Sequence, residues 1–180
     1  MPRLSTPTRD EAPAASQPLL DAVKRQLGVI PNLYRVVANS PAALAALTGL
    51  GGALGKTLDV RRRERIAIAV AEVNGCDYCL SAHSYLALNL AKLPAEEVEL
   101  ARQGASHDAK ADAAVGFAAK VARARGHVQD ADLAAVRAAG YSDAEIVEIV
   151  ALVAENVFTN FVNSVADTEI DFPVIRARAA

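Results

Sequence analysis

Both cysteines of the chain lie in one short stretch, NGCDYCLSAHSYLA, residues 74–87. Cys76 and Cys79 are three positions apart, and His83 follows four positions later. Residues separated by three or four positions share one face of a helix, so a helix here brings two thiols and an imidazole together. A reactive thiolate, a second thiol that closes a disulfide and a base are the groups that a dithiol peroxidase or a disulfide reductase needs.

The two thiols differ in what would make them acidic. Cys76 lies nearer the expected helix N-terminus, where the helix dipole favours a thiolate by about 0.3–1 kcal/mol. His83 lies one turn beyond Cys79 and can accept its proton. A direct imidazole partner lowers a cysteine pKa by more than a dipole does. We therefore predict that Cys79 is the more acidic thiol.

Two other interpretations of the cysteine pair remain open. A buried cysteine can serve simply as a small apolar side chain. Cys76, Cys79 and His83 could also supply three zinc ligands. A closed zinc site needs a fourth ligand, which would have to be His107 or His127 from a distant segment. Since no second pair of ligands supports zinc, we expect neither a metal nor another cofactor.

The composition of the rest of the chain, and the residues that begin and end its expected helices, are typical of packed helices. Hydrophobic residues make up 52% of the 180 residues, much of this is alanine, and aromatic residues make up only 4%. Such sequence favours closely packed helices, and no alternating strand pattern interrupts it. We predict an all-α, single-domain helical bundle over residues 18–180. Residues 1–17, rich in Pro, Ser, Thr and charge, should form a flexible N-terminal arm.

Each expected helix begins at a capping residue or a proline, and most end at a glycine. The last one opens with a capping box formed by Ser142 and Glu145. The expected helices cover residues 19–27, 41–54, 60–73, 76–93, 94–103, 109–125, 130–139 and 142–165.

Charge and hydropathy exclude several classes of protein. A formal net charge of −2 gives no reason to expect nucleic acid or an anionic membrane as a partner. Residues 1–18 lack the apolar core of a signal peptide, and no window of about 18 uncharged apolar residues occurs. We expect a soluble cytoplasmic protein. In that compartment a close cysteine pair is more often redox-active or metal-binding than a permanent crosslink.

The spacing of four residues in this sequence resembles that of a known family. Glu64 is followed after eleven residues by Cys76-Asp77-Tyr78-Cys79, and after three more by His83. This pattern resembles the signature of the alkylhydroperoxidase D-like proteins, which belong to the wider carboxymuconolactone decarboxylase superfamily. The flanking stretches GVIPNLYRVVANSPAAL and FTNFVNSVADTEIDFP are similar to its peroxidase-related members.

The resemblance implies a helical bundle that assembles as a homo-oligomer, a trimer or a hexamer, and reduces hydroperoxides through the cysteine pair. It assigns peroxide attack to Cys79, resolution of the intermediate to Cys76, and proton relay to His83 and Glu64. An external dithiol reductant or a thiol-carrying protein would restore the thiols. The chain departs from the pattern at Tyr78, where the best-known peroxidases of the family carry a second histidine. Tyrosine cannot shuttle protons near neutral pH as imidazole does.

Alternatives for individual residues and for the whole protein stay open. Glu64 lies among four arginines and could simply pair with one of them, within a subunit or across an interface. Asn156, Asn160 and Asn163 recur along the last expected helix, and we interpret them as amides that bond between packed helices. The alternative to a peroxidase is a non-enzymatic, redox-responsive or structural homo-oligomer of the same superfamily.

Overall fold

The computed structural model describes residues 2–178, and within that range the chain is helical with no strands. This confirms the predicted all-α class. The helices of the described part are α1 (Gln17–Leu27), α2 (Asn32–Val37), α3 (Pro41–Leu54), α4 (Val60–Val73), α5 (Asp77–Asn89), α6 (Ala95–Arg102), α7 (Ala109–Arg123), α8 (Asp130–Ala138) and α9 (Asp143–Ala166).

Local capping explains why most helices begin where the sequence predicts. Ser40 accepts a hydrogen bond from the Ala43 N–H at the start of α3, and Asp59 accepts one from Arg62 at the start of α4. Ser142 forms the predicted capping box with Glu145 at the start of α9. The short helix α2 is not among the expected helices, because its six residues are too few to show helical periodicity.

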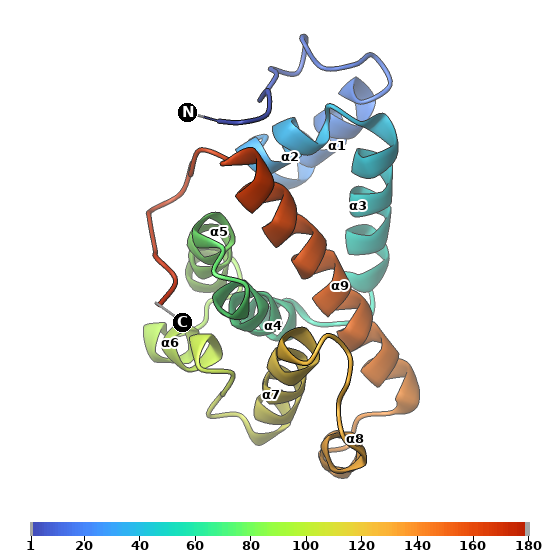
Figure 1. Cartoon of the computed structure of the whole chain (residues 1–180), viewed down its shortest axis with the longest axis vertical. Coiled ribbons are helices and arrows are strands. Elements are labelled where there is room, and N and C mark those ends of the chain that lie inside the picture. Colours follow the sequence, from blue (N-terminus) through green and yellow to red (C-terminus); the bar gives the residue numbers. More distant parts are fainter. Residues whose placement is uncertain (1, 179–180) are drawn as a thin grey trace.

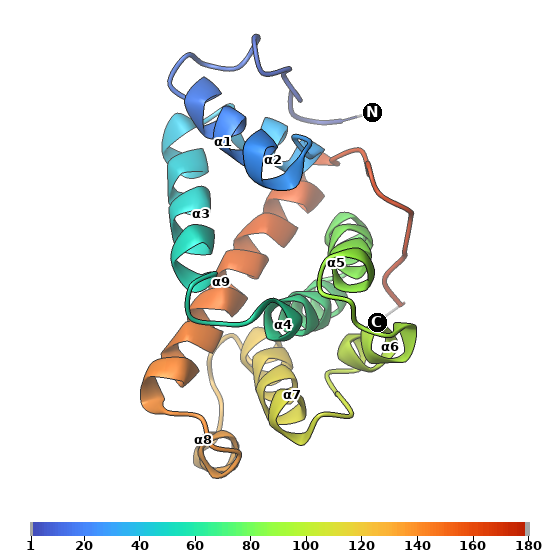
Figure 2. The ribbon, with the colours of Figure 1, turned by 180° about the vertical axis from the view of Figure 1, so that it is seen from behind.

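Helix α4 is the central element of the bundle, and residues 64–71 of it are all buried. One of its sides packs with α7 and α9 in an apolar cluster. Its other side packs with α5 and α6 in a second cluster. Helix α9 runs obliquely through the molecule, with α1–α3 on one side and α4–α6 on the other (Figures 1 and 2). Residues on α4, α5 and α9 therefore meet in the interior.

The N-terminal segment, residues 2–16, contains no helix and lies against α1 and α2. Arg9 forms an ion pair with Asp21 at 2.7 Å, and Arg35 donates a hydrogen bond to the Pro7 carbonyl. Residue 1 of the predicted arm lies outside the described residues. None of the helices in residues 2–178 is long and apolar enough to cross a membrane.

The C-terminal segment, residues 167–178, turns back after α9 and runs past α5 toward α6 (Figure 1). The Ile175 N–H donates to the Ser81 hydroxyl at 2.9 Å, and the Ala177 N–H donates to the Asp77 carboxylate at 2.8 Å. Arg102 donates to the Arg176 carbonyl. These contacts hold the segment over the N-terminal turns of α5, where both cysteines lie.

Candidate active site

The cysteine pair is positioned by the sharp turn between α4 and α5. Gly75 adopts a positive φ of 66°, which glycine tolerates without strain. The next residue, Cys76, is the N-cap of α5 rather than part of its first turn, so the helix begins one residue later than predicted. Its sulfur accepts a hydrogen bond from the Cys79 N–H at 3.3 Å. A thiol thus takes the place that a serine or aspartate oxygen usually holds at a helix start.

The two sulfurs lie side by side in the interior. Their Sγ atoms are 2.7 Å apart, and the residues are only 3% and 2% exposed. A disulfide bond is about 2.05 Å long, so a small approach of the two atoms is enough to close one. Both cysteines are reduced in this structure.

Glu64 and His83 form a buried pair beside the thiols. The His83 Nδ1 atom lies 2.8 Å from a Glu64 carboxylate oxygen, and the glutamate side chain is 9% exposed against 25% for the histidine. Burial lowers the pKa of His83, but the charge and hydrogen bond of Glu64 outweigh it, so the net shift is upward. The structure therefore brings together all four residues that the sequence pattern singled out: Glu64, Cys76, Cys79 and His83.

The surroundings of the two thiols push their pKa values in opposite directions. The hydrogen bond from Cys76 is the largest influence on Cys79 and lowers its pKa, against the effect of burial. The positive charge of His83 lowers it further, and the pKa of Cys79 falls to about 7. The same hydrogen bond, together with burial, raises the pKa of Cys76 far above its usual range. Cys79 is thus the more acidic of the two thiols.

Two asparagines of α9 complete the surroundings of Cys79. The Asn163 Nδ2 atom donates to the Cys79 sulfur at 3.2 Å. The amide of Asn160 also lowers the pKa of Cys79, and its Oδ1 atom accepts a hydrogen bond from Asn74 at 2.8 Å. Asn160 is fully buried and Asn163 is 3% exposed. The sequence interpretation treated these amides only as bonds between helices. Both lie on the buried face of α9, but Asn156 and Thr159 lie there too, so burial alone could not have singled them out.

Asn156, the third asparagine of the series, bonds within its own helix rather than between helices as the sequence interpretation expected. Its Nδ2 atom donates to the Leu152 carbonyl of the same helix at 2.8 Å.

Tyr78 is turned toward structural partners. Its hydroxyl oxygen accepts a hydrogen bond from the Leu33 N–H at 3.0 Å, and its ring meets Phe172 of the C-terminal segment edge to face. Burial raises the pKa of Tyr78 well above its usual value. The residue therefore links α2, α5 and the C-terminal segment, and its proton is held more firmly than in water.

Glu155 is a further carboxylate on the His83 side of the thiols. Burial raises its pKa, while His83 and Arg63 lower it less strongly. It reaches toward Gly51 on α3, where a Cβ atom would lie 2.6 Å from the Glu155 Oε1 atom. The absence of a side chain at Gly51 thus leaves room for this carboxylate.

The two histidines that the zinc interpretation would need as a fourth ligand both lie in loops. His107 lies in the loop between α6 and α7, and His127 in the loop between α7 and α8. No group of three or more His, Cys, Asp or Glu residues suited to a metal ion occurs among the residues that the structure describes.

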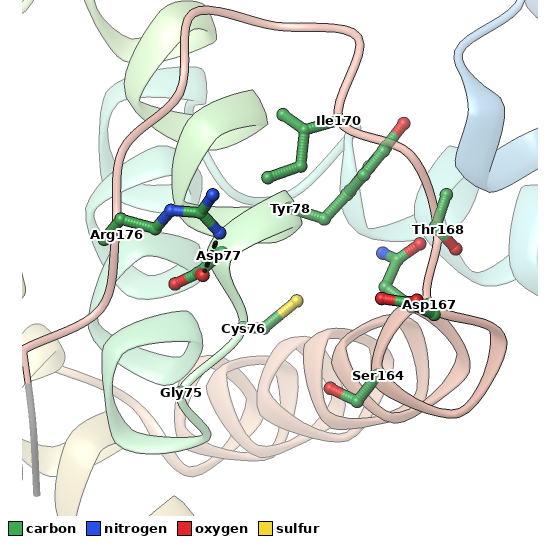
Figure 3. Close-up of a pocket in the computed structure, with 10 residues that line it drawn as sticks. Gly75, Cys76, Asp77, Tyr78, Ser164, Asp167, Thr168, Ile170 and Arg176 are labelled. Atoms are coloured by element: carbon green, nitrogen blue, oxygen red, sulfur yellow. Dashed lines mark hydrogen bonds and ion pairs between the residues drawn. The ribbon is translucent and has the colours of Figure 1, made fainter. Parts of the chain in front are cut away.

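A polar cavity of about 180 Å³ opens beside Cys76, between the start of α5, the end of α9 and the C-terminal segment. The Cys76 sulfur points into it, toward the side where Asp167 and Thr168 lie (Figure 3). Asp77 and Arg176 form an ion pair of 2.7 Å at its edge. The lining residues are Gly75, Cys76, Asp77, Tyr78, Asn163, Ser164, Asp167, Thr168, Ile170 and Arg176, and Cys79 is not among them.

Comparison with known proteins supports the family resemblance. Residues 41–124 match the model of the carboxymuconolactone decarboxylase family. No curated protein matches the sequence.

Solved structures with the same fold include two peroxidase-related proteins. One is an alkylhydroperoxidase D core, a peroxidase-related protein from Ralstonia eutropha JMP134. The two sequences are 26% identical, the match spans 94% of this chain and 92% of the other, and the TM-score is 0.82. Another, from Silicibacter sp. TM1040, is 28% identical over 93% and 91% of the two chains, with a TM-score of 0.79. A debrominase is 23% identical over 94% and 92%, also with a TM-score of 0.79. At 23% identity, the similarity to the debrominase shows a shared fold only.

Proposed function

Because the chain belongs to the alkylhydroperoxidase D-like and carboxymuconolactone decarboxylase superfamily, we propose that it is a cysteine-dependent hydroperoxide reductase. The observation that carries the proposal is the environment of Cys79. This thiol has a pKa of about 7, a second sulfur at 2.7 Å and a charged His83–Glu64 pair as its neighbour. A thiolate at neutral pH, a resolving thiol and a proton relay are then present in one place.

The first step is attack of the Cys79 thiolate on the terminal oxygen of a hydroperoxide. The oxygen–oxygen bond breaks, Cys79 becomes a sulfenic acid, and the alkoxide leaves as an alcohol after it takes a proton. The Nδ1 atom of His83 is engaged by Glu64, so we assign the proton transfer to Nε2, directly or through water. The Glu64 carboxylate holds the ring and stabilises its positive charge.

The second step closes the disulfide. Cys76 attacks the sulfenic sulfur of Cys79, its proton passes to the relay, and the hydroxyl group leaves as water. Two electrons from an external thiol reductant then restore the two thiols. Release of water at this point needs no metal or other cofactor.

The alternative is a redox-responsive or structural protein that does not turn over. A peroxide-consumption assay with dithiothreitol as donor separates the two. A reductase consumes many equivalents of peroxide per chain and loses both activity and disulfide formation in Cys79→Ser. A protein that loses two thiols once, and then consumes no more peroxide while donor is present, would contradict the proposal.

We propose further that the protein is a homo-oligomer that assembles through α9. The resemblance implies a trimer or a hexamer, and α9 carries an apolar stripe on the face opposite its buried one. The stripe occupies about a quarter of the helix circumference. Its most exposed members are Val147, Val150, Phe158, Phe161 and Val165, each at least 40% exposed. Such a stripe marks an interaction surface when it is continuous.

Sedimentation at micromolar concentration tests the assembly. We expect a closed oligomer for the natural sequence and a shift to smaller species for Phe161→Glu, which puts a charge into the stripe. Tyr85→Glu is a matched control, because Tyr85 is also an exposed aromatic residue but lies on α5. A natural sequence that sediments as a monomer would refute this part.

A further inference from the structure

The polar cavity reaches only one of the two sulfurs. Cys76 lines it, whereas Cys79 is enclosed by His83 and the α9 amides. Cys76 itself is 3% exposed, so a reagent meets its sulfur through the cavity rather than from the outer surface. We propose that this cavity binds the reducing thiol, and that it selects small thiols with an amide N–H close to the sulfur, such as cysteamine amides and cysteinyl peptides. The proposal rests on the proposed function, since it concerns the same disulfide.

Two buried polar atoms of the cavity wall have no partner in the protein. The Asn163 Oδ1 and Thr168 Oγ1 atoms make no hydrogen bond, although these residues are only 3% and 8% exposed. Buried polar groups are nearly always satisfied, and the exceptions call for an explanation. The Asn163 amide is oriented by its bond from Nδ2 to Cys79, which leaves the carbonyl end unpaired. A carbonyl oxygen only accepts hydrogen bonds, so the missing partner is a donor such as an amide N–H.

The volume of the cavity suits a small molecule. Its volume of about 180 Å³ has room for several water molecules. Tyr78 and Ile170 supply apolar surface for methylene groups. The C-terminal segment closes the outer side and is fixed there by Asp77 and Ser81. A small thiol fits this volume, whereas the 3% exposure of Cys76 leaves no room for a folded protein surface to reach its sulfur.

The chemistry follows from the difference between the two sulfurs. The thiolate of the reductant attacks Cys76, the bond between Cys76 and Cys79 breaks, and its electron pair leaves on Cys79. Cys79 is the better leaving group because its pKa is about 7. Cys76 now holds the reductant in a mixed disulfide. A second thiol attacks the reductant's sulfur, which releases Cys76 and a small-molecule disulfide. In sum two donor thiols are oxidised, and their protons end on the two cysteines.

The test measures reduction of the preformed Cys76–Cys79 disulfide in the full chain by stopped flow, with no peroxide present. N-acetylcysteamine and 2-mercaptoethyl acetate are compared, because they differ only in an amide N–H against an ester oxygen. We expect the amide to react about three- to tenfold faster, the range that one hydrogen bond contributes.

Substitutions in the cavity wall test where that preference comes from. Thr168→Val and Asn163→Leu should bring the ratio of the two rates close to one. Ser164→Ala is the matched control and should keep the ratio. Ser164 lines the same cavity, but its hydroxyl already donates to the Asn160 carbonyl at 2.9 Å.

Two results would overturn the proposal. Equal rates for the amide and the ester in the natural sequence would mean that water alone fills the cavity. If the ratio of the amide rate to the ester rate is unchanged in both Thr168→Val and Asn163→Leu, the reducing thiol binds elsewhere. Because this assay contains no peroxide, an amide preference without peroxide turnover would refute the proposed function and leave the thiol site standing.

Discussion

The two sulfurs of the pair stand in contrasting surroundings, although they are close enough to touch. Cys79 lies on the interior side, where a thiol of Cys76, a cationic His83 and an amide of Asn163 all stabilise negative charge. Cys76 lies on the cavity side, where burial, the charge of Cys79 and that of Asp77 oppose ionisation. Cys76 is nearer the helix N-terminus, yet it is the less acidic thiol. The thiol of Cys76, the charge of His83 and the amide of Asn163 therefore outweigh the helix dipole.

The contrast divides the proposed cycle between two sides of one disulfide. Peroxide chemistry belongs to Cys79 and its relay, and reduction belongs to Cys76 and the cavity under the C-terminal segment. A substitution that reaches only one side should therefore change one half of the cycle and spare the other, whereas Asn163, which contacts Cys79 and also lines the cavity, should affect both.

Glu64→Gln should have the largest effect. Loss of the carboxylate removes the charge that keeps His83 protonated, and general acid–base catalysis contributes about 10²–10⁴-fold. We expect kcat/KM for peroxide to fall within that range, with the thiol count and the helical circular dichroism unchanged. Stopped-flow oxidation of the reduced protein measures the effect.

Glu72→Gln is the matched control for Glu64→Gln. Glu72 lies on the same helix and also forms an ion pair, with Arg102 at 2.6 Å, but it faces the C-terminal segment. Peroxide attack should be normal in this variant. If Glu64→Gln dissociates the oligomer while its peroxide kinetics stay normal, Glu64 has only a structural role.

Asn163→Leu should shift the acidity of Cys79. The rate of peroxide oxidation of the natural sequence should rise with pH around a midpoint near 7, because the thiolate is the reactive form and the pKa of Cys79 is about 7. Loss of a hydrogen bond to a charged sulfur should raise the midpoint by about one pKa unit. Rates measured between pH 5 and 9 give the midpoint. Asn156→Leu should leave it in place, because that amide bonds to Leu152; equal shifts in both variants would indicate a general effect on α9.

Tyr78→Phe should have the smallest effect on catalysis. The hydroxyl accepts a hydrogen bond from the buried Leu33 N–H, so its removal should lower the free energy of unfolding by about 0.5–1.5 kcal/mol. Thermal or urea unfolding measures that loss. Peroxide kinetics should match those of the natural sequence. A large loss of rate in a stable Tyr78→Phe protein would show that the tyrosine shares in proton transfer.

Much of the fold could be predicted because its signals are local. Ser40, Asp59 and Ser142 start helices through their own side chains, and Gly28 and Gly140 follow helix ends with positive φ. Helical spacing also indicates which residues of one element share a face. The C-terminal segment gave no such signal, since its position depends on single contacts with Asp77, Ser81 and Arg102 rather than on a periodic pattern.

From helical spacing, the candidate site could be predicted only where its residues lie on one element, because spacing along the sequence then shows which of them are close. Cys76, Cys79 and His83 stand on one element, so their proximity is readable from spacing. Asn163 reaches Cys79 across 84 positions of sequence, and only the packing of α5 against α9 brings them together. Two of the three α9 asparagines affect the thiol and one does not, although all three are buried on the same helix. Sequence spacing cannot separate them.

The central claim is that peroxide attacks Cys79 and the reductant attacks Cys76. The most direct measurement treats reduced Cys76→Ser and Cys79→Ser with one equivalent of peroxide in the presence of a sulfenic-acid trap, and locates the adduct by mass spectrometry. The account predicts an adduct on Cys79 in Cys76→Ser and none in Cys79→Ser, with turnover lost in both. An adduct on Cys76 in the Cys79→Ser protein, and none on Cys79 in the other variant, would contradict it.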